Sequence, residues 1–137
     1  MHTDTTNDFL KWNSAVATSA NFQIVTKDID FGEPGRNKKI YKVLVTYDTG
    51  NAASNVQVDY DVNGGTTFPY DFADGTQFAS TELATANGWK VAELKPDAPS
   101  ESNNIKSFQL RFATDGTVPT GFRINDISIV YRAKRPR

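Results

Sequence analysis

The sequence of 137 residues contains no cysteine, a single histidine and no long run of apolar residues. Without cysteine, the chain can form neither a disulfide framework nor a zinc site built from thiolates. The only histidine is His2, in the polar N-terminal stretch, so no pair of a serine nucleophile and a histidine base is expected. No segment is apolar enough to predict a membrane-spanning helix or a secretory signal peptide. We therefore expect synthesis in a cytoplasm and no membrane partner.

The charge of the chain is nearly balanced, with a formal net charge of −1. A balanced charge creates no general attraction to nucleic acid, which we do not expect as a partner. The C-terminus is nevertheless basic, with Arg132, Lys134, Arg135 and Arg137 close together. Two interpretations stay open for this tail. It docks on an acidic partner surface, or it is a solvated end that keeps an edge strand from pairing with other chains.

Apolar and polar residues alternate along most of the chain after residue 20, which is typical of half-buried β-strands. No helical period of ten or more residues is present. We predict an all-β fold, an antiparallel β-sandwich or jelly roll of about seven to eight strands. The domain spans residues 21–132, after a flexible N-terminal arm at 1–20 and before a basic C-terminal tail at 133–137.

The run KKIYKVLVTY at residues 38–47 predicts a central strand, because it carries apolar residues on both faces. Tyr41, Val43, Val45 and Tyr47 are expected on one face, and Ile40 and Leu44 on the other, which would be partly covered. In GFRINDISIVYR at residues 121–132, the apolar parity changes at Asn125-Asp126, which predicts a β-bulge. In GWKVAELK at residues 88–95, we expect Trp89 and Val91 to point inward.

The stretch DYDVNGG matches the first half of an EF-hand calcium loop, D-x-D-x-N-G. The twelfth position of such a loop is Tyr70, which offers no carboxylate, and the flanking residues have the period of strands rather than helices. We therefore predict a β-hairpin with a turn at Asn63-Gly64, in which Asp59 and Asp61 face solvent. A calcium site of another type at this turn stays open as the alternative.

The sequence contains no phosphate-binding loop, no dinucleotide fingerprint and no metalloprotease motif. Its paired carboxylates alternate along strands, as on a solvated face. We therefore expect no enzyme activity, no metal and no cofactor. The candidate binding residues are aromatic: Tyr70, Phe72 and Trp89 for a sugar, and Trp12 as the anchor of the N-terminal arm. The alternative is that such rings cover the core or a subunit interface.

Three separated stretches carry a resemblance to a known family. They are KDIDFGEPGRNKKIYKVLVTY, then GWKVAELKP with NNIKSFQLRF, and finally GFRINDISIVYR. Together they resemble a β-domain that recurs in structural proteins of tailed bacteriophages, where the same motifs follow in the same order. The similarity covers about residues 22–132. The final stretch is also similar to the closing strand of galactose-binding-like jelly rolls.

The resemblance implies a non-catalytic virion protein: a tail or neck accessory protein, a fibre subunit or a capsid decoration protein. Its partners would be other capsid, neck or tail subunits, its location the virion, and its own state a homo-oligomer, with a trimer expected. The alternative is a carbohydrate-binding β-sandwich module that attaches to a cell surface through a host glycan.

Overall fold

The computed structural model describes residues 22–73, 81–114 and 116–135. Trp12, Arg137 and the predicted N-terminal arm lie outside the described residues. These contain nine strands and no helix, so no helix there could cross a membrane. The strands are β1 (Gln23–Val25), β2 (Lys38–Asp48), β3 (Val56–Val62), β4 (Tyr70–Ala73), β5 (Thr81–Glu82), β6 (Lys90–Pro96), β7 (Asn103–Ile105), β8 (Phe108–Thr114) and β9 (Arg123–Ala133).

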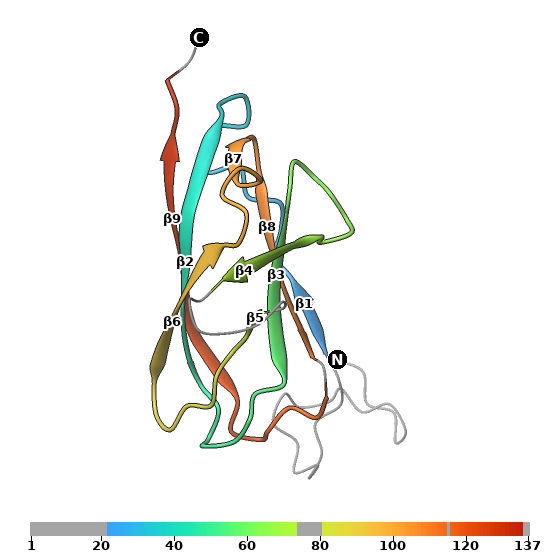
Figure 1. Ribbon diagram of the computed structural model, residues 1–137, viewed down its shortest axis with the longest axis vertical. Helices are drawn as coiled ribbons and strands as arrows, with labels where there is room; N and C mark the ends of the chain where they lie inside the picture. The colour runs from blue at the N-terminus through green and yellow to red at the C-terminus, as the bar shows by residue number, and fades with distance from the viewer. Residues whose placement is uncertain (1–21, 74–80, 115, 136–137) are drawn as a thin grey trace, which may run out of the picture.

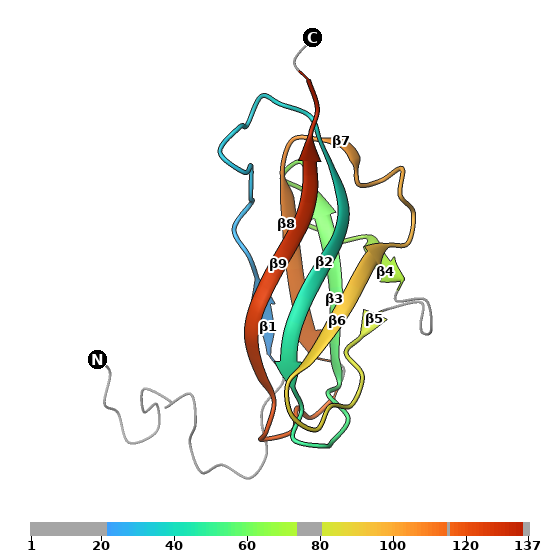
Figure 2. The ribbon, with the colours of Figure 1, turned by 90° about the vertical axis from the view of Figure 1, so that its left-hand side faces the viewer.

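The strands form a continuous antiparallel sheet that curls so that two layers face each other (Figures 1 and 2). One layer contains β9, β2 and β6, with the short β7 beside β2, and the other contains β1, β8 and β3, with β5 beside β3. On one side β4 pairs with both β3 and β6 and so joins the layers. The all-β antiparallel prediction is confirmed, whereas the finer assignment to a sandwich or jelly roll stays a prediction.

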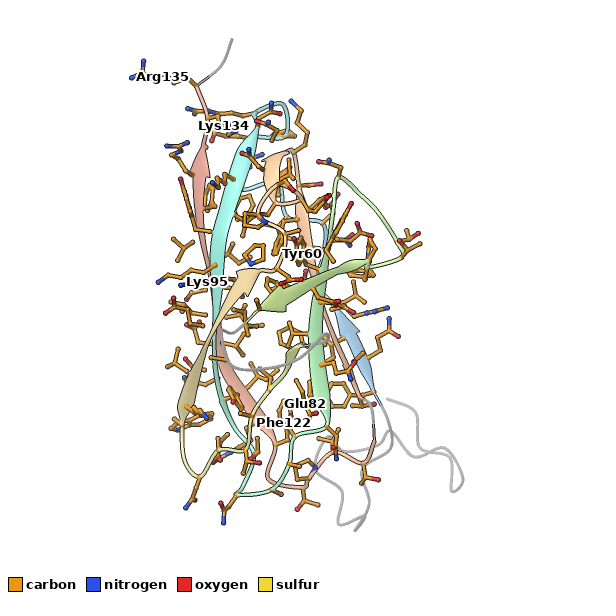
Figure 3. The ribbon with its side chains drawn as sticks, in the orientation of Figure 1. Tyr60, Glu82, Lys95, Phe122, Lys134 and Arg135 are labelled. Atoms are coloured by element: carbon orange, nitrogen blue, oxygen red, sulfur yellow. The ribbon has the colours of Figure 1, made fainter. Side chains whose placement is uncertain are left out.

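The hydrophobic core lies between the two layers and is built from alternate residues of the longest strands. The side chains at its centre are Val43, Val45 and Tyr47 from β2, Val56, Val58 and Tyr60 from β3, and Phe108, Leu110 and Phe112 from β8. Figure 3 labels Tyr60 in this position. Each fully buried apolar side chain contributes about 1.5–3 kcal/mol through the hydrophobic effect, so the core accounts for much of what holds the layers together.

The central position predicted for residues 38–47 is confirmed, because β2 pairs with β6 on one side and β9 on the other. The prediction that Tyr41 shares a face with Val43, Val45 and Tyr47 is wrong. The register of β2 against β9 shifts between Ile40 and Lys42, so Tyr41 is the extra residue of a bulge. Ile40 therefore lies in the core, and Tyr41 is 41% exposed.

The bulge predicted in the last strand is confirmed. Tyr47 lies opposite Ile124 and Thr46 opposite Asp126, which leaves Asn125 without a partner in the register. The bulge returns Ile127 to the face that Ile124 occupies, and both pack against the core.

The turn of the predicted hairpin is also confirmed. Asn63 and Gly64 both have left-handed backbones, with φ of 55° and 76°. The returning strand is β4, in which Tyr70 pairs with Tyr60.

The prediction that Asp59 and Asp61 face solvent is wrong. Asp61 is buried, and its carboxylate accepts hydrogen bonds from the backbone N–H groups of Val62, at 2.8 Å, and Phe68, at 3.0 Å. The loop between the turn and β4 folds back over β3. The Asp61 carboxylate accepts hydrogen bonds from the backbone N–H groups of this loop. Asp59 is half-buried and forms a two-pronged ion pair with Arg111 of β8, with Nε 2.9 Å from Oδ1.

Candidate functional site

Among the predicted aromatic site residues that the structure describes, the most exposed is Trp89, which directly precedes β6. Its exposed fraction is 54%, and that of Val91 is 57%, so the prediction that both point inward is wrong. The register of β6 explains the error: Leu94 lies opposite Val43 and is buried, which places odd-numbered residues of this strand on the outer face. The stretch GWKVAELK carries apolar residues on both parities, so its sequence pattern could not decide between the faces.

Trp89 is part of a small cluster with Arg123 and Asp48. The guanidinium carbon of Arg123 lies 4.8 Å from the centre of the Trp89 ring, a typical cation–π distance. The same guanidinium donates from Nη2 to Oδ2 of Asp48 at 2.6 Å. The cluster therefore presents one indole ring whose neighbour is a fixed positive charge.

The carboxylate of Asp48 anchors this cluster. Its side chain is 7% exposed, and its Oδ1 accepts hydrogen bonds from the backbone N–H groups of Gly50, at 2.9 Å, and Gly88, at 3.2 Å. The Gly50 N–H bond, followed by the Arg123 bond, holds the pKa of Asp48 below its usual value. A carboxylate that is satisfied in this way is an anchor and not a general base.

The cluster forms because three chain segments meet at one end of the same layer. Asp48 ends β2 and pairs with Arg123, which begins β9, while Trp89 precedes Lys90, the partner of Tyr47. Arg123 and Asp48 could not be recognised as site residues from the sequence, because only the register of non-adjacent strands brings them together.

The outer face of the β9–β2–β6 layer continues from this cluster. Its rows are Val91, Thr46 and Asp126, then Glu93, Leu44 and Ser128, and then Lys42 and Val130. Glu93 lies 3.5 Å from the amines of both Lys42 and Lys95, so its carboxylate offsets part of their positive charge within the face. The face is regular, is held rigidly by the core behind it and mixes apolar with polar side chains.

The other aromatic candidates do not join Trp89. Phe72 is fully buried in the core, so its predicted role in ligand contact is wrong. Tyr70 is half-buried, with its ring 5.3 Å from that of Tyr60, and burial followed by the Glu101 carboxylate raises its pKa. Phe72 pairs with Pro96, the last residue of β6. Trp89 precedes the first residue of β6, so the two aromatic residues are separated by roughly 20 Å along the strand.

The basic tail is partly bound to the body of the protein. The backbone N–H of Lys134 donates to the carbonyl of Asn37 at 2.8 Å, and its amine donates to Oδ1 of Asn104 at 2.5 Å. The carbonyl of Lys134 accepts from the guanidinium of Arg36. Arg132 and Arg135 are exposed, and Figure 3 shows Lys134 and Arg135 where the chain leaves β9.

Two further findings bear on the site. Within residues 22–73, 81–114 and 116–135, no group of three histidine, aspartate or glutamate side chains is placed to hold a metal ion. Comparison of the chain with protein-family models, curated proteins and solved structures gives no match.

Proposed function

We propose that the chain is a non-catalytic structural protein of a bacteriophage virion, in which it acts as a tail or neck accessory, fibre or capsid decoration subunit. The proposal is supported by the resemblance of residues 22–132 to a virion β-domain and by one structural observation. That observation is the exposed outer side of the β9–β2–β6 layer. Its strands and the adjoining loop carry large exposed hydrophobic side chains: Tyr41, Trp89, Val91 and Val130.

A rigid layer of this kind suits assembly with other proteins. Interfaces between proteins combine exposed apolar side chains with a polar rim. Here some of the charged groups next to the apolar ones already form ion pairs, as Glu93 does with Lys42 and Lys95. A partner that covers the layer would bury this apolar surface, and it would supply polar or charged groups for the charges that remain, such as that of Asp126.

The test is quantitative mass spectrometry of phage particles purified from the source organism. We expect the chain in the particles at a defined ratio to the other virion proteins. A Val91→Asp variant should be incorporated less than wild type, because it places a charge on the apolar part of the layer, whereas Gln23→Asp, at an exposed site on β1, should not differ from wild type. Absence of the chain from purified particles would overturn the proposal.

A second candidate function is carbohydrate binding for attachment to a cell surface, and Trp89 is the observation that favours it. An exposed indole held beside a fixed guanidinium offers a flat apolar surface and hydrogen-bond donors to a sugar. We expect a glycan array or cell-wall fraction to retain wild type and Val91→Ala but not Trp89→Ala. If wild type binds neither, this candidate is excluded.

A further inference from the structure

The outer edge of β9 has no partner strand among the described residues. β9 pairs with β2 along its whole length on one side, and the sheet order assigns it no second neighbour. It faces β1 across a seam, on the side of the molecule opposite to the junction made by β4. An unpaired edge of this length is a template for another strand.

The direction of the backbone groups of β9 follows from its last contact with β2. The N–H of Lys134 donates to Asn37, the residue before β2. Backbone groups alternate along a strand, so even-numbered residues of this stretch point toward β2. The odd-numbered Ile127, Ile129 and Tyr131 direct their N–H and C=O groups to the free edge. No hydrogen bond joins these groups to any other described residue.

The segment across the seam is already bonded elsewhere. The N–H groups of Thr26 and Ile29 each donate at 2.9 Å to carbonyls of β8, so this segment extends the other layer. The contacts across the seam are between rings, Phe22 with Phe122 at 6.2 Å and Phe31 with Tyr131 at 4.0 Å. These rings pack on the core side of β9. They make no hydrogen bonds to the backbone N–H and C=O groups at its free edge.

We propose that β9 of a second copy adds to this edge in antiparallel orientation, about a two-fold axis at Ile129. Ile129 would then exchange hydrogen bonds with Ile129 of the second copy, and Ile127 with its Tyr131. All the outward backbone groups of this stretch become paired. On the outer face, Asp126 of each copy lies opposite Arg132 of the other, and Ser128 lies opposite Val130.

Charge selects this register among those that the backbone permits. An axis at Ser128 would place Asp126 opposite Val130 and leave Arg132 opposite Ile124. An axis at Val130 would place Arg132 opposite Ser128, and Asp126 opposite Lys134, whose amine already donates to Asn104. Only the axis at Ile129 pairs an exposed aspartate with an exposed arginine twice. The one side-chain contact within the described residues that competes is the hydroxyl of Ser128, which donates to Asp126 at 3.0 Å.

This inference goes beyond the proposed virion role and does not depend on it, because the pairing needs only copies of this chain. It favours a dimer as the basic unit, in place of the trimer expected from the sequence. It also gives the exposed Arg132 an acidic partner, Asp126 of the second copy.

The first test measures molar mass by light scattering after gel filtration of the full chain. We expect wild type to dimerise reversibly, and Arg132→Asp to raise the dissociation constant at least tenfold, because each aspartate then faces another. The exchange variant Asp126→Arg/Arg132→Asp should restore dimerisation. Lys95→Asp, which makes the same charge change on β6 of this layer, should dimerise like wild type. A wild type that stays monomeric at high micromolar concentration, or an exchange variant as weak as Arg132→Asp, would overturn the proposal.

The second test reads the register directly, since the chain has no cysteine of its own. Residues 128 and 130 of the two copies would face each other at a non-hydrogen-bonded pair, where Cα atoms lie close enough for a disulfide. An oxidised mixture of Ser128→Cys and Val130→Cys should give a linked heterodimer, and neither variant alone should link. Linkage of Ser128→Cys alone or Val130→Cys alone would place the axis elsewhere and refute the charge argument. Thermal unfolding of each variant verifies that it is folded.

Discussion

A Cβ atom added to Gly65 would lie 2.3 Å from both carboxylate oxygens of Asp61. Atoms do not approach so closely without displacement, so only glycine leaves room for this buried carboxylate. The same carboxylate accepts hydrogen bonds from the N–H groups of Thr67, at 3.2 Å, and Phe68, at 3.0 Å. The acidic motif that resembles half a calcium loop is therefore a hairpin whose second aspartate caps the following loop.

Replacing Gly65 with alanine should lower the free energy of unfolding by about 3 kcal/mol, because the methyl group displaces the Asp61 carboxylate from its donors. Urea denaturation measures this loss. The matched control is Gly35→Ala, since a Cβ at Gly35 meets nothing within 4 Å and its backbone is not left-handed. That variant should stay within about 0.5 kcal/mol of wild type or gain slightly. Equal stability of the two variants would mean that Asp61 does not cap the loop.

The alternation of apolar and polar residues along the strands explains how much of the fold could be predicted. The central position of β2 and the bulge at Asn125 were predictable, because buried positions leave a visible pattern of apolar residues. The bulge at Tyr41 was not, since tyrosine suits either face of a strand. Trp89 and Val91 were misplaced for the same reason: strands with apolar residues on both parities fit either orientation, and only packing against the other layer decides.

The candidate site was less predictable than the fold. Trp89 was recognised as a residue able to bind a ligand, but its partners Arg123 and Asp48 come from strands far away in the sequence. The residues around Asp48 in the sequence do not indicate that its carboxylate will accept hydrogen bonds from two backbone N–H groups and a guanidinium. Phe72 shows the converse problem, because the sequence left open whether its ring contacts a ligand or covers the core, and the structure places it fully in the core.

The hydroxyl of Tyr60 is buried and has no hydrogen-bond partner among the described residues. A buried polar group without a partner costs free energy, so Tyr60→Phe should raise the free energy of unfolding by about 1 kcal/mol. The control is Tyr47→Phe, because the Tyr47 hydroxyl donates to the carbonyl of Ala84 at 2.8 Å. That variant should lose about 1 kcal/mol. A loss of stability in both variants, measured by urea denaturation, would show that the Tyr60 hydroxyl is bonded in solution.

Asp71 should make the stability of the protein depend on pH. Burial, followed by the charges of Asp59 and Asp97, raises its pKa above the ordinary 3.8. A raised pKa favours the folded state below pH 3.8, and this contribution is lost as the pH rises through the folded-state pKa. Asp71→Asn should therefore be more stable than wild type at neutral pH, and this advantage should vanish below about pH 3.8.

The measurement is the urea midpoint of Asp71→Asn and of wild type across this pH range. The control variant is Asp28→Asn, in which an exposed aspartate near the hairpin turn loses its charge. An advantage of Asp71→Asn that is the same at both ends of the range would show that the effect does not come from titration of this carboxyl group.

Trp89 can serve as a probe of function only if the fold tolerates its loss. Because 54% of the side chain is exposed, Trp89→Ala should lower the free energy of unfolding by no more than about 1 kcal/mol, including its contact with Arg123. Leu94→Ala on β6 should cost about 3 kcal/mol, because Leu94 is buried in the core. Urea denaturation compares the two variants. If Trp89→Ala were as damaging as Leu94→Ala, the indole would be a structural element of this end of the layer. Its loss could then not distinguish a binding role from a folding defect.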